Sequence, residues 1–172
     1  MDFLSWIRLK KKVKKVKKTV AVSAKRSYII RVMRDMKDYT IKVDESGTKS
    51  WYFNGMLHRE DGPAFEQENG YKEWYLKGQL HREDGPAIEY ANGTKEWYFN
   101  GKLHREDGPA IEYANGYKAW FINGQHHRED GPAVEQADGT KFWYLNGKYH
   151  REDGPVVEYY KERGVNGRLN KV

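Results

Sequence analysis

The sequence predicts an all-β repeat array, an elongated, twisted antiparallel sheet of stacked β-hairpins with about two strands in each 23-residue unit. The hexapeptide His-Arg-Glu-Asp-Gly-Pro recurs five times at this interval, first at His58 and last at Pro155. The tryptophans keep the same spacing, at Trp51, Trp74, Trp97, Trp120 and Trp143. Each unit also holds two glycine turns between alternating polar and apolar residues, which is typical of hairpins. Fixed periods of this length indicate units that pack mainly on their neighbours.

The composition limits the core that this array can form. Leu, Ile, Val and Phe make up 32 of the 172 residues, which by itself is typical of disorder, yet aromatic residues reach 15%, which is not. We therefore expect the tryptophans to supply much of the core. The absence of cysteine excludes disulfides, thiol catalysis and thiolate metal sites and favours an intracellular, cytoplasmic location, in the host cytoplasm if the source is viral. No apolar run is long enough for a membrane-spanning helix.

The charge divides the chain into segments. Residues 1–40 carry a net charge of +10, whereas residues 41–172 carry −4. Residues 1–26 are predicted to form a basic amphipathic arm with the composition of a disordered segment, and residues 27–41 a short helical adaptor, because apolar residues at 29, 32, 33 and 36 suit one helix face. Five repeats follow over residues 42–160, and residues 161–172 form a C-terminal cap or tail.

The fourth repeat shows how the faces are assigned. If Asn115-Gly116 is a two-residue type I′ turn, Ile111 lies opposite Trp120, and Ile111, Trp120 and Ile122 share the core face. The other face then carries an aromatic row and an acidic row. The aromatic row is Tyr52, Tyr75, Tyr98, Phe121 and Tyr144, and the acidic row is Glu66, Glu89, Glu112, Glu135 and Glu158.

The run Asn100-Gly101-Lys102-Leu103-His104, with Gly108 and Tyr113-Ala114-Asn115-Gly116 after it, resembles the MORN repeat, whose unit is also about 23 residues long. The chain departs from that family in every repeat, because His-Arg-Glu-Asp-Gly-Pro replaces the usual His-Gly-x-Gly. The resemblance implies an elongated hairpin array that serves protein–protein contact or membrane-proximal scaffolding rather than chemistry. Such variants are associated with phage, giant viruses and bacteria, which suggests a viral protein acting on a host protein.

The His-Arg-Glu-Asp-Gly-Pro stretch has a structural interpretation and three alternatives. Five near-identical copies indicate that Asp107 caps the Gly-Pro turn, His104 packs or hydrogen-bonds between units, and Arg105 pairs with Glu106. The alternatives are a repeated cation site with Asp107 and Glu112 as oxygen ligands, a hydrolase or metal enzyme, and a partner-binding row of Arg and Glu. We expect no catalytic residue, metal, cofactor or small-molecule substrate.

The expected function is that of a non-enzymatic interaction or scaffold protein that binds a partner protein on the curved face of the array. Because Tyr and Arg are enriched at interfaces and the last two repeats are the most aromatic, seven residues are predicted to contact the partner. They are Tyr98, Arg105, Glu112, Phe121, Arg128, Tyr144 and Tyr149.

The alternative function is binding of nucleic acid or an anionic membrane surface through the basic arm. The residues predicted for that contact are Lys10, Lys11, Lys12, Lys14, Lys15, Lys17, Lys18, Lys25 and Arg26. The array itself is a poor surface for nucleic acid, because the glutamate row would repel phosphates.

Overall fold

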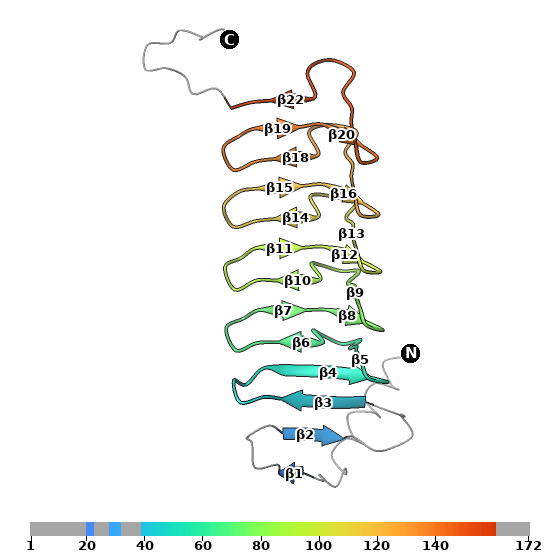
Figure 1. Cartoon of the computed structure of the whole chain (residues 1–172), viewed down its shortest axis with the longest axis vertical. Coiled ribbons are helices and arrows are strands. Elements are labelled where there is room, and N and C mark those ends of the chain that lie inside the picture. The colour runs from blue at the N-terminus through green and yellow to red at the C-terminus, as the bar shows by residue number, and fades with distance from the viewer. Residues whose placement is uncertain (1–19, 23–27, 32–38, 161–172) are drawn as a thin grey trace, which may run out of the picture. The chain divides into compact units, whose positions relative to one another are not determined.

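The protein, in a computed structural model, is described here over residues 20–22, 28–31 and 39–160. The chain divides into two compact units, residues 1–80 and residues 81–172. Every regular element in the described ranges is a β-strand, and the strands within each unit pair antiparallel (Figure 1). The predicted all-β array of stacked hairpins is therefore confirmed.

The first unit contains one sheet and one separate hairpin. The sheet follows the order β1 (Val20–Val22), β2 (Tyr28–Arg31), β3 (Tyr39–Val43), β4 (Lys49–Phe53), β6 (Phe65–Glu66) and β7 (Lys72–Glu73), and β5 (Met56–Leu57) pairs with β4. The separate hairpin joins β8 (Tyr75–Leu76) to β9 (Gln79–Leu80).

The short helical adaptor predicted over residues 27–41 is wrong over residues 28–31, which form β2 between β1 and β3, and over residues 39–41, which belong to β3. β-Branched residues such as Ile29 and Ile30 favour a strand, and two partner strands outweigh a weak helical pattern. Residues 32–38 of that predicted helix, most of the basic arm and the predicted cap at 161–172 lie outside the described residues.

The second unit repeats one arrangement. Its main sheet follows the order β10 (Ile88–Glu89), β11 (Lys95–Glu96), β14 (Ile111–Glu112), β15 (Lys118–Ala119), β18 (Val134–Glu135), β19 (Lys141–Phe142) and β22 (Val157–Glu158). Three small hairpins branch from it: β12 (Tyr98–Phe99) with β13 (Lys102–Leu103), β16 (Phe121–Ile122) with β17 (Gln125–His126), and β20 (Tyr144–Leu145) with β21 (Lys148–Tyr149).

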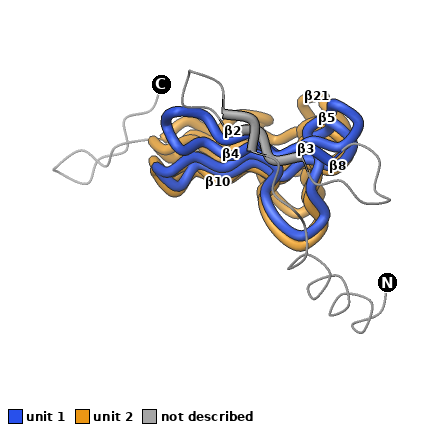
Figure 2. Tube along the Cα trace, turned by 90° about the horizontal axis from the view of Figure 1, so that it is seen from below, with its two compact units in different colours: residues 1–80 blue, residues 81–172 orange. Residues whose placement is uncertain are grey.

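A complete repeat in this unit thus has four two-residue strands, such as β14 to β17, where the sequence predicted about two. The strands of the main sheet form successive rungs in Figure 1, and Figure 2, which looks along the stack, shows the tube of this unit following nearly the same outline from repeat to repeat.

The turn at Asn115-Gly116 is longer by one residue than predicted. The Tyr113 amide donates a hydrogen bond of 2.9 Å to the Tyr117 carbonyl, so Ala114, Asn115 and Gly116 form a three-residue loop. Only Gly116 has a positive φ, at 93°, while the Asn115 side chain accepts a hydrogen bond from the Tyr117 amide at 3.0 Å. The type I′ turn lies instead in the small hairpin, where both Asn123 (φ 52°) and Gly124 (φ 82°) are left-handed.

This extra loop residue leaves Ile111 on the core face, as predicted, but reverses the predicted faces of the strands that follow the turn. Ile111 lies opposite Ala119 rather than Trp120, and a shift of one residue moves the rest of the strand to the other side of the sheet. The buried cluster is Ile111, Ala119 and Val134. The partly buried side chains packed on it are Leu103, Tyr117, Phe121, Phe142 and Tyr144. Phe121 and Tyr144, predicted on the face opposite the core, therefore belong to the core.

The tryptophans are half-buried and lie on the other face, so the prediction that they supply the core is wrong. That face also carries an alternating ladder of charge. Glu89 lies opposite Lys95 and Glu112 opposite Lys118 within the hairpins, and Lys95 lies opposite Glu112 between them. Opposite charges at directly opposed positions stabilise a sheet, so this ladder supports the observed register.

Candidate functional site

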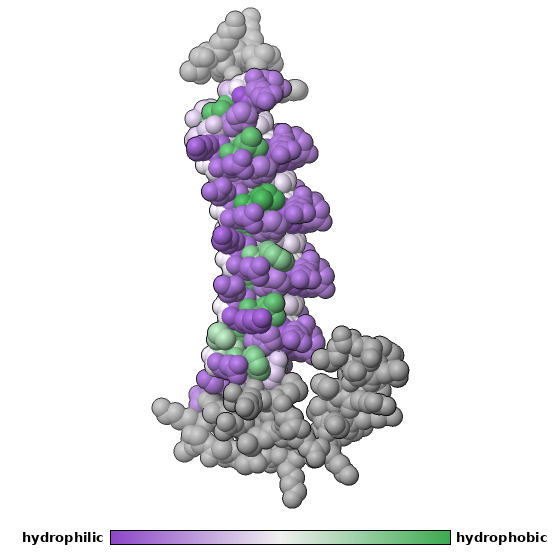
Figure 3. Space-filling model, turned by 90° about the vertical axis from the view of Figure 1, so that its right-hand side faces the viewer, coloured by the Kyte–Doolittle hydropathy of each residue, from purple (hydrophilic) through white to green (hydrophobic). Residues whose placement is uncertain are grey.

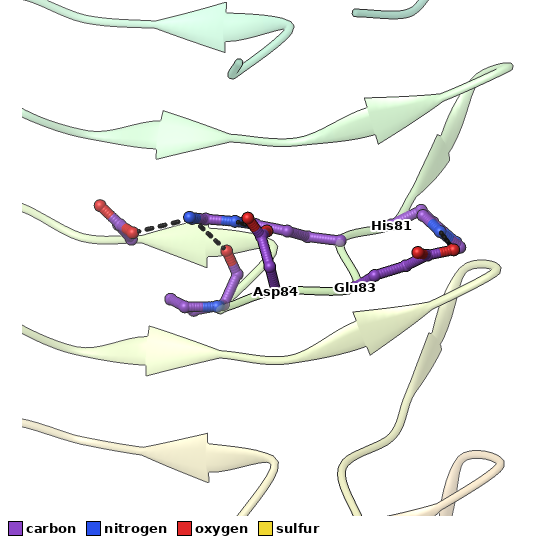
Figure 4. Close-up of polar contacts among 6 residues, drawn as sticks. His81, Glu83 and Asp84 are labelled. Carbon is purple, nitrogen blue, oxygen red and sulfur yellow. Dashed lines mark hydrogen bonds and ion pairs between the residues drawn. The ribbon is translucent and has the colours of Figure 1, made fainter. Parts of the chain in front are cut away.

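Each His-Arg-Glu-Asp-Gly-Pro stretch is a loop that is closed by its own arginine. In the loop of residues 81–86, Arg82 donates from Nε to Asp84 Oδ1 at 2.9 Å and from Nη1 to the Pro86 carbonyl at 3.2 Å. Nη1 also donates to Glu89 Oε1 at 3.1 Å, on the strand that follows the loop (Figure 4). The arginine thus ties the loop to itself and to the main sheet.

The same closure recurs in the later loops. Arg105 donates to Asp107 at 2.9 Å, to the Pro109 carbonyl at 3.2 Å and to Glu112 at 2.9 Å. Its guanidinium carbon lies 4.1 Å from the centre of the Trp97 ring, within range for cation–π attraction. The prediction that Arg105 pairs with Glu106 is wrong, because Asp107 and Glu112 occupy its donors. Arg128 and Arg151 make the equivalent contacts with Trp120 and Trp143.

The loop histidines link consecutive repeats. His104 Nδ1 accepts a hydrogen bond of 3.1 Å from the Asn123 amide in the next repeat, and His81 Nδ1 accepts one of 3.2 Å from Asn100. The predicted hydrogen bond between neighbouring repeats is therefore confirmed for His81 and His104. On its other side, Nε2 of His104 lies 3.8 Å from the Glu106 carboxylate.

What each loop presents to solvent is a pair of carboxylates. The side chains of Glu106 and Asp107 are 87% and 84% exposed, whereas that of Arg105 is only 21% exposed. We call these pairs the acidic doublets. In the second unit they are Glu83-Asp84, Glu106-Asp107, Glu129-Asp130 and Glu152-Asp153.

The arginine contacts alter the acidity of the aspartates in three of the doublets. The hydrogen bond from Arg105, assisted by its charge, lowers the pKa of Asp107 below its usual value. Arg82 and Arg128 lower the pKa of Asp84 and Asp130 in the same way. These carboxylates are therefore ionised at neutral pH, and the loops keep their negative charge.

Grooves lie between successive loops. One of about 870 Å³ separates the loops that start at His81 and His104, and Trp97 and Phe99 line it together with the acidic doublets of both loops. A second of about 720 Å³ lies between the loops that start at His127 and His150, with Trp143 and Leu145 in place of Trp97 and Phe99. Each groove thus combines an aromatic and apolar lining with carboxylates on either side. Hydrophilic surface dominates the side of the molecule seen in Figure 3, with small apolar spots at regular intervals.

The predicted partner-binding residues fall in two separate groups. Arg105, Glu112 and Arg128 belong to the loops and their supporting strands, where their charges are already paired. Tyr98, Phe121, Tyr144 and Tyr149 belong to the small hairpins.

The aromatic residues of the last two repeats stack in a column. The ring centres are 4.0 Å apart for Phe121 and His126, 5.0 Å for His126 and Tyr144, and 4.4 Å for Tyr144 and Tyr149. Tyr149 is 54% exposed, and partial burial raises the pKa of Tyr144 to about 12. Burial also lowers the pKa of His126, whose Nδ1 is buried without a hydrogen-bond partner. The column is a continuous stack of rings that begins in the core, and of its four members only Tyr149 is largely open to solvent.

Sequence reasoning missed the acidic doublets as surface features, because it paired Arg105 with Glu106. A detectable signal existed: an arginine two residues before an aspartate and seven before a strand glutamate recurs in every repeat, and the arginine can satisfy both. The alternative of a cation site at Asp107 and Glu112 meets an arginine already placed between the two carboxylates. Over the described ranges, no cluster of three or more His, Asp or Glu side chains is arranged to hold a metal.

The basic residues predicted to contact nucleic acid or membrane, from Lys10 to Arg26, lie outside the described residues. In the part of the chain that the structure does describe, no helix is long and apolar enough to cross a membrane.

Fold and loops together define a class of protein: a β-hairpin repeat protein in which an arginine closes one loop per repeat against a tryptophan. No protein-family model matches the chain, and no curated protein matches it either.

Proposed function

We propose that the chain is a non-enzymatic interaction protein whose successive His-Arg-Glu-Asp-Gly-Pro loops, which we call the loop column, bind cationic side chains of a partner protein. The observation that carries this proposal is the arrangement of exposed acidic doublets on both sides of a groove lined by tryptophan. A lysine or arginine beside the groove packs its aliphatic stem near this apolar lining and places its charge against the carboxylates of a loop.

The closed state of the arginines supports a cationic rather than an anionic partner. Arg105 stacks on Trp97 and donates to two carboxylates and a carbonyl, so its charge is compensated within the loop. Glu106 has only a histidine 3.8 Å away, so its charge faces solvent. Repeated five times along the sequence, this loop gives the array a regular series of negative charges. Complementary charge steers association and selects the partner.

The resemblance to MORN repeats agrees with an interaction role, since that family implies protein contact or scaffolding on a hairpin array. The finer assignment to a MORN-like family and a location inside the cell are parts of this proposal. The lack of cysteine favours the latter.

Binding of a labelled nonalysine peptide to the full-length chain, followed by fluorescence anisotropy, tests the proposal. The double substitution Glu106→Gln with Glu129→Gln should weaken binding about fivefold, because each exposed ion pair contributes about 0.5 kcal/mol. The control, Glu45→Gln with Glu68→Gln, makes the same charge change at exposed positions away from the loops. Equal weakening by both pairs would show non-specific charge attraction and contradict the proposal.

Nucleic-acid or membrane binding through residues 1–26 is a second proposal, supported by the net charge of +10 over residues 1–40. Lysine rather than arginine dominates the run, which favours diffuse attraction to phosphates over base recognition. Its test is binding of the full chain to a DNA duplex and to anionic vesicles at several salt concentrations. Substitution of Lys14 and Lys15 by Gln should reduce the salt dependence.

A further inference from the structure

The basic arm contains a second periodic pattern, with a period of three residues. Lys11-Lys12, Lys14-Lys15 and Lys17-Lys18 are lysine doublets separated by the single valines Val13 and Val16. We propose that this lysine segment, residues 11–18, docks on the acidic doublets of a second copy of the chain. The inference rests on the proposed function of the loop column and names its occupant.

The two periods match in length. Each repeat adds two strands to the main sheet of the second unit, and neighbouring strands are about 4.8 Å apart, so the acidic doublets recur about every 10 Å. A chain in polyproline II geometry advances about 3.1 Å per residue, or about 9 Å per three residues, and a β-strand advances about 10 Å. One lysine doublet therefore meets each acidic doublet, with a drift below about 1 Å per repeat.

The order of residues within the period also matches the grooves. In polyproline II geometry every third residue lies on the same edge, so Val13 and Val16 share one edge and the lysines occupy the other two. A valine edge directed at the grooves meets apolar lining such as Trp97 and Phe99. The flanking lysines then reach the carboxylates of the loops on either side, among them Glu106 and Asp107.

The position of the segment in the chain favours a second copy over the same chain. Thr19 alone separates Lys18 from β1, the first strand of the sheet in the first unit. In that sheet β1 is three strands from β4, a distance of about 14 Å. The eight residues of the lysine segment, fully extended, reach about 28 Å. In its own chain the segment would therefore use roughly half of its length to reach the first loop, the one that follows β4 and β5. Three lysine doublets on three acidic doublets therefore require the loops of another molecule.

Cross-linking between isotopically distinct copies provides the direct test. Full-length light and heavy protein are mixed and treated at low salt with a zero-length carbodiimide, which joins lysine amines to carboxylates. We expect light–heavy cross-links from Lys11–Lys18 to Glu83, Glu106 or Glu129, and their loss at high salt. Cross-links confined to single copies, or none from these lysines, would overturn the proposal.

A composition-matched variant tests the period itself. Exchanging two neighbours, Lys12→Val with Val13→Lys, keeps the charge of the arm but changes the valine spacing from three to four residues. Self-association, measured by sedimentation velocity, should weaken about fivefold in this variant and in Glu106→Gln/Glu129→Gln, and stay unchanged in Glu45→Gln/Glu68→Gln. Unchanged association after the exchange would overturn the proposal. Nonalysine binding that persists in a strictly monomeric protein would overturn this inference alone and leave the proposed function standing.

Discussion

Gly108 is the residue through which the closed loop can be tested most sharply. A Cβ at this position would lie 2.9 Å from Arg105 Cζ and 3.1 Å from both Nε and Nη2, closer than ordinary van der Waals contact. The backbone of Gly108 is not left-handed, so alanine is tolerated there in conformational terms. Gly108→Ala should therefore act by displacing the guanidinium.

The cost of this displacement follows from what the guanidinium contacts. The cation–π contact with Trp97, at 4.1 Å, contributes about 0.5–1 kcal/mol, and the hydrogen bond to the Pro109 carbonyl about 0.5–1.5 kcal/mol. Gly108→Ala should then lower the free energy of unfolding by about 1–2 kcal/mol. In an Arg105→Ala background nothing remains to be displaced, and the same substitution should be neutral or stabilise by about 0.4–1 kcal/mol, because alanine restricts the unfolded chain.

Urea unfolding of the four proteins in this double-mutant cycle measures the coupling. Gly116→Ala is the control, since Gly116 has a φ of 93° and open space around its Cβ. Its cost of about 1 kcal/mol arises in the backbone and should be the same with and without Arg105. A Gly108→Ala cost that is equal in both backgrounds would refute the role of the arginine.

Three further outcomes are expected. Burial lowers the pKa of His126, so the unfolded chain takes up a proton more readily than the folded chain as the pH falls below the ordinary value of about 6.5. Stability should therefore decrease on acidification from pH 7 to 5. His126→Leu, which introduces the residue found at the equivalent position 103, should flatten that part of a plot of melting temperature against pH. Asn123→Ala should cost about 1 kcal/mol in urea unfolding, because φ is 52° there, whereas Asn123→Gly should be nearly neutral; equal costs would argue against the left-handed turn. Finally, the pKa values of Asp84, Asp107 and Asp130 are lowered by their arginines. The stability that these ion pairs contribute is therefore present above the ordinary pKa of about 3.9 and is lost as the pH falls through the lower pKa values of the folded state. Thermal melts between pH 5 and 2 would measure this loss.

The repeat, the hairpins and the histidine link between repeats could be predicted from the sequence because each depends on local chemistry at fixed spacing. The faces of the sheet could not be predicted from the Asn-Gly dipeptide alone. Asn115-Gly116 and Asn123-Gly124 are identical in sequence, yet the first has one left-handed residue in a three-residue loop and the second has two in a two-residue turn.

Charge pairing across the strands distinguishes the two registers. The two-residue turn sets Tyr113 against Lys118, whereas the observed loop sets Glu112 against Lys118, and the same Glu–Lys pairing recurs at Glu89 with Lys95. Opposite charges in each hairpin favour the longer loop. The same error affected the prediction of the candidate site. Because tryptophan was predicted in the core, Trp97 was not considered as a partner of Arg105, and the closed loop was missed.

The hydrogen bond from Asn123 to His104 joins residues 19 positions apart, and its equivalent joins Asn100 to His81. The length of the chain in this region can therefore change without disturbing these links only in steps of one whole repeat. Deleting residues 105–127 removes 23 residues and returns each later side chain to a position held by its counterpart one repeat earlier. Deleting one residue more or fewer would instead leave one strand a residue out of step and turn the rest of that strand to the opposite face. Genes for such chains can therefore lengthen or shorten by whole repeats while each surviving loop still closes on its own arginine.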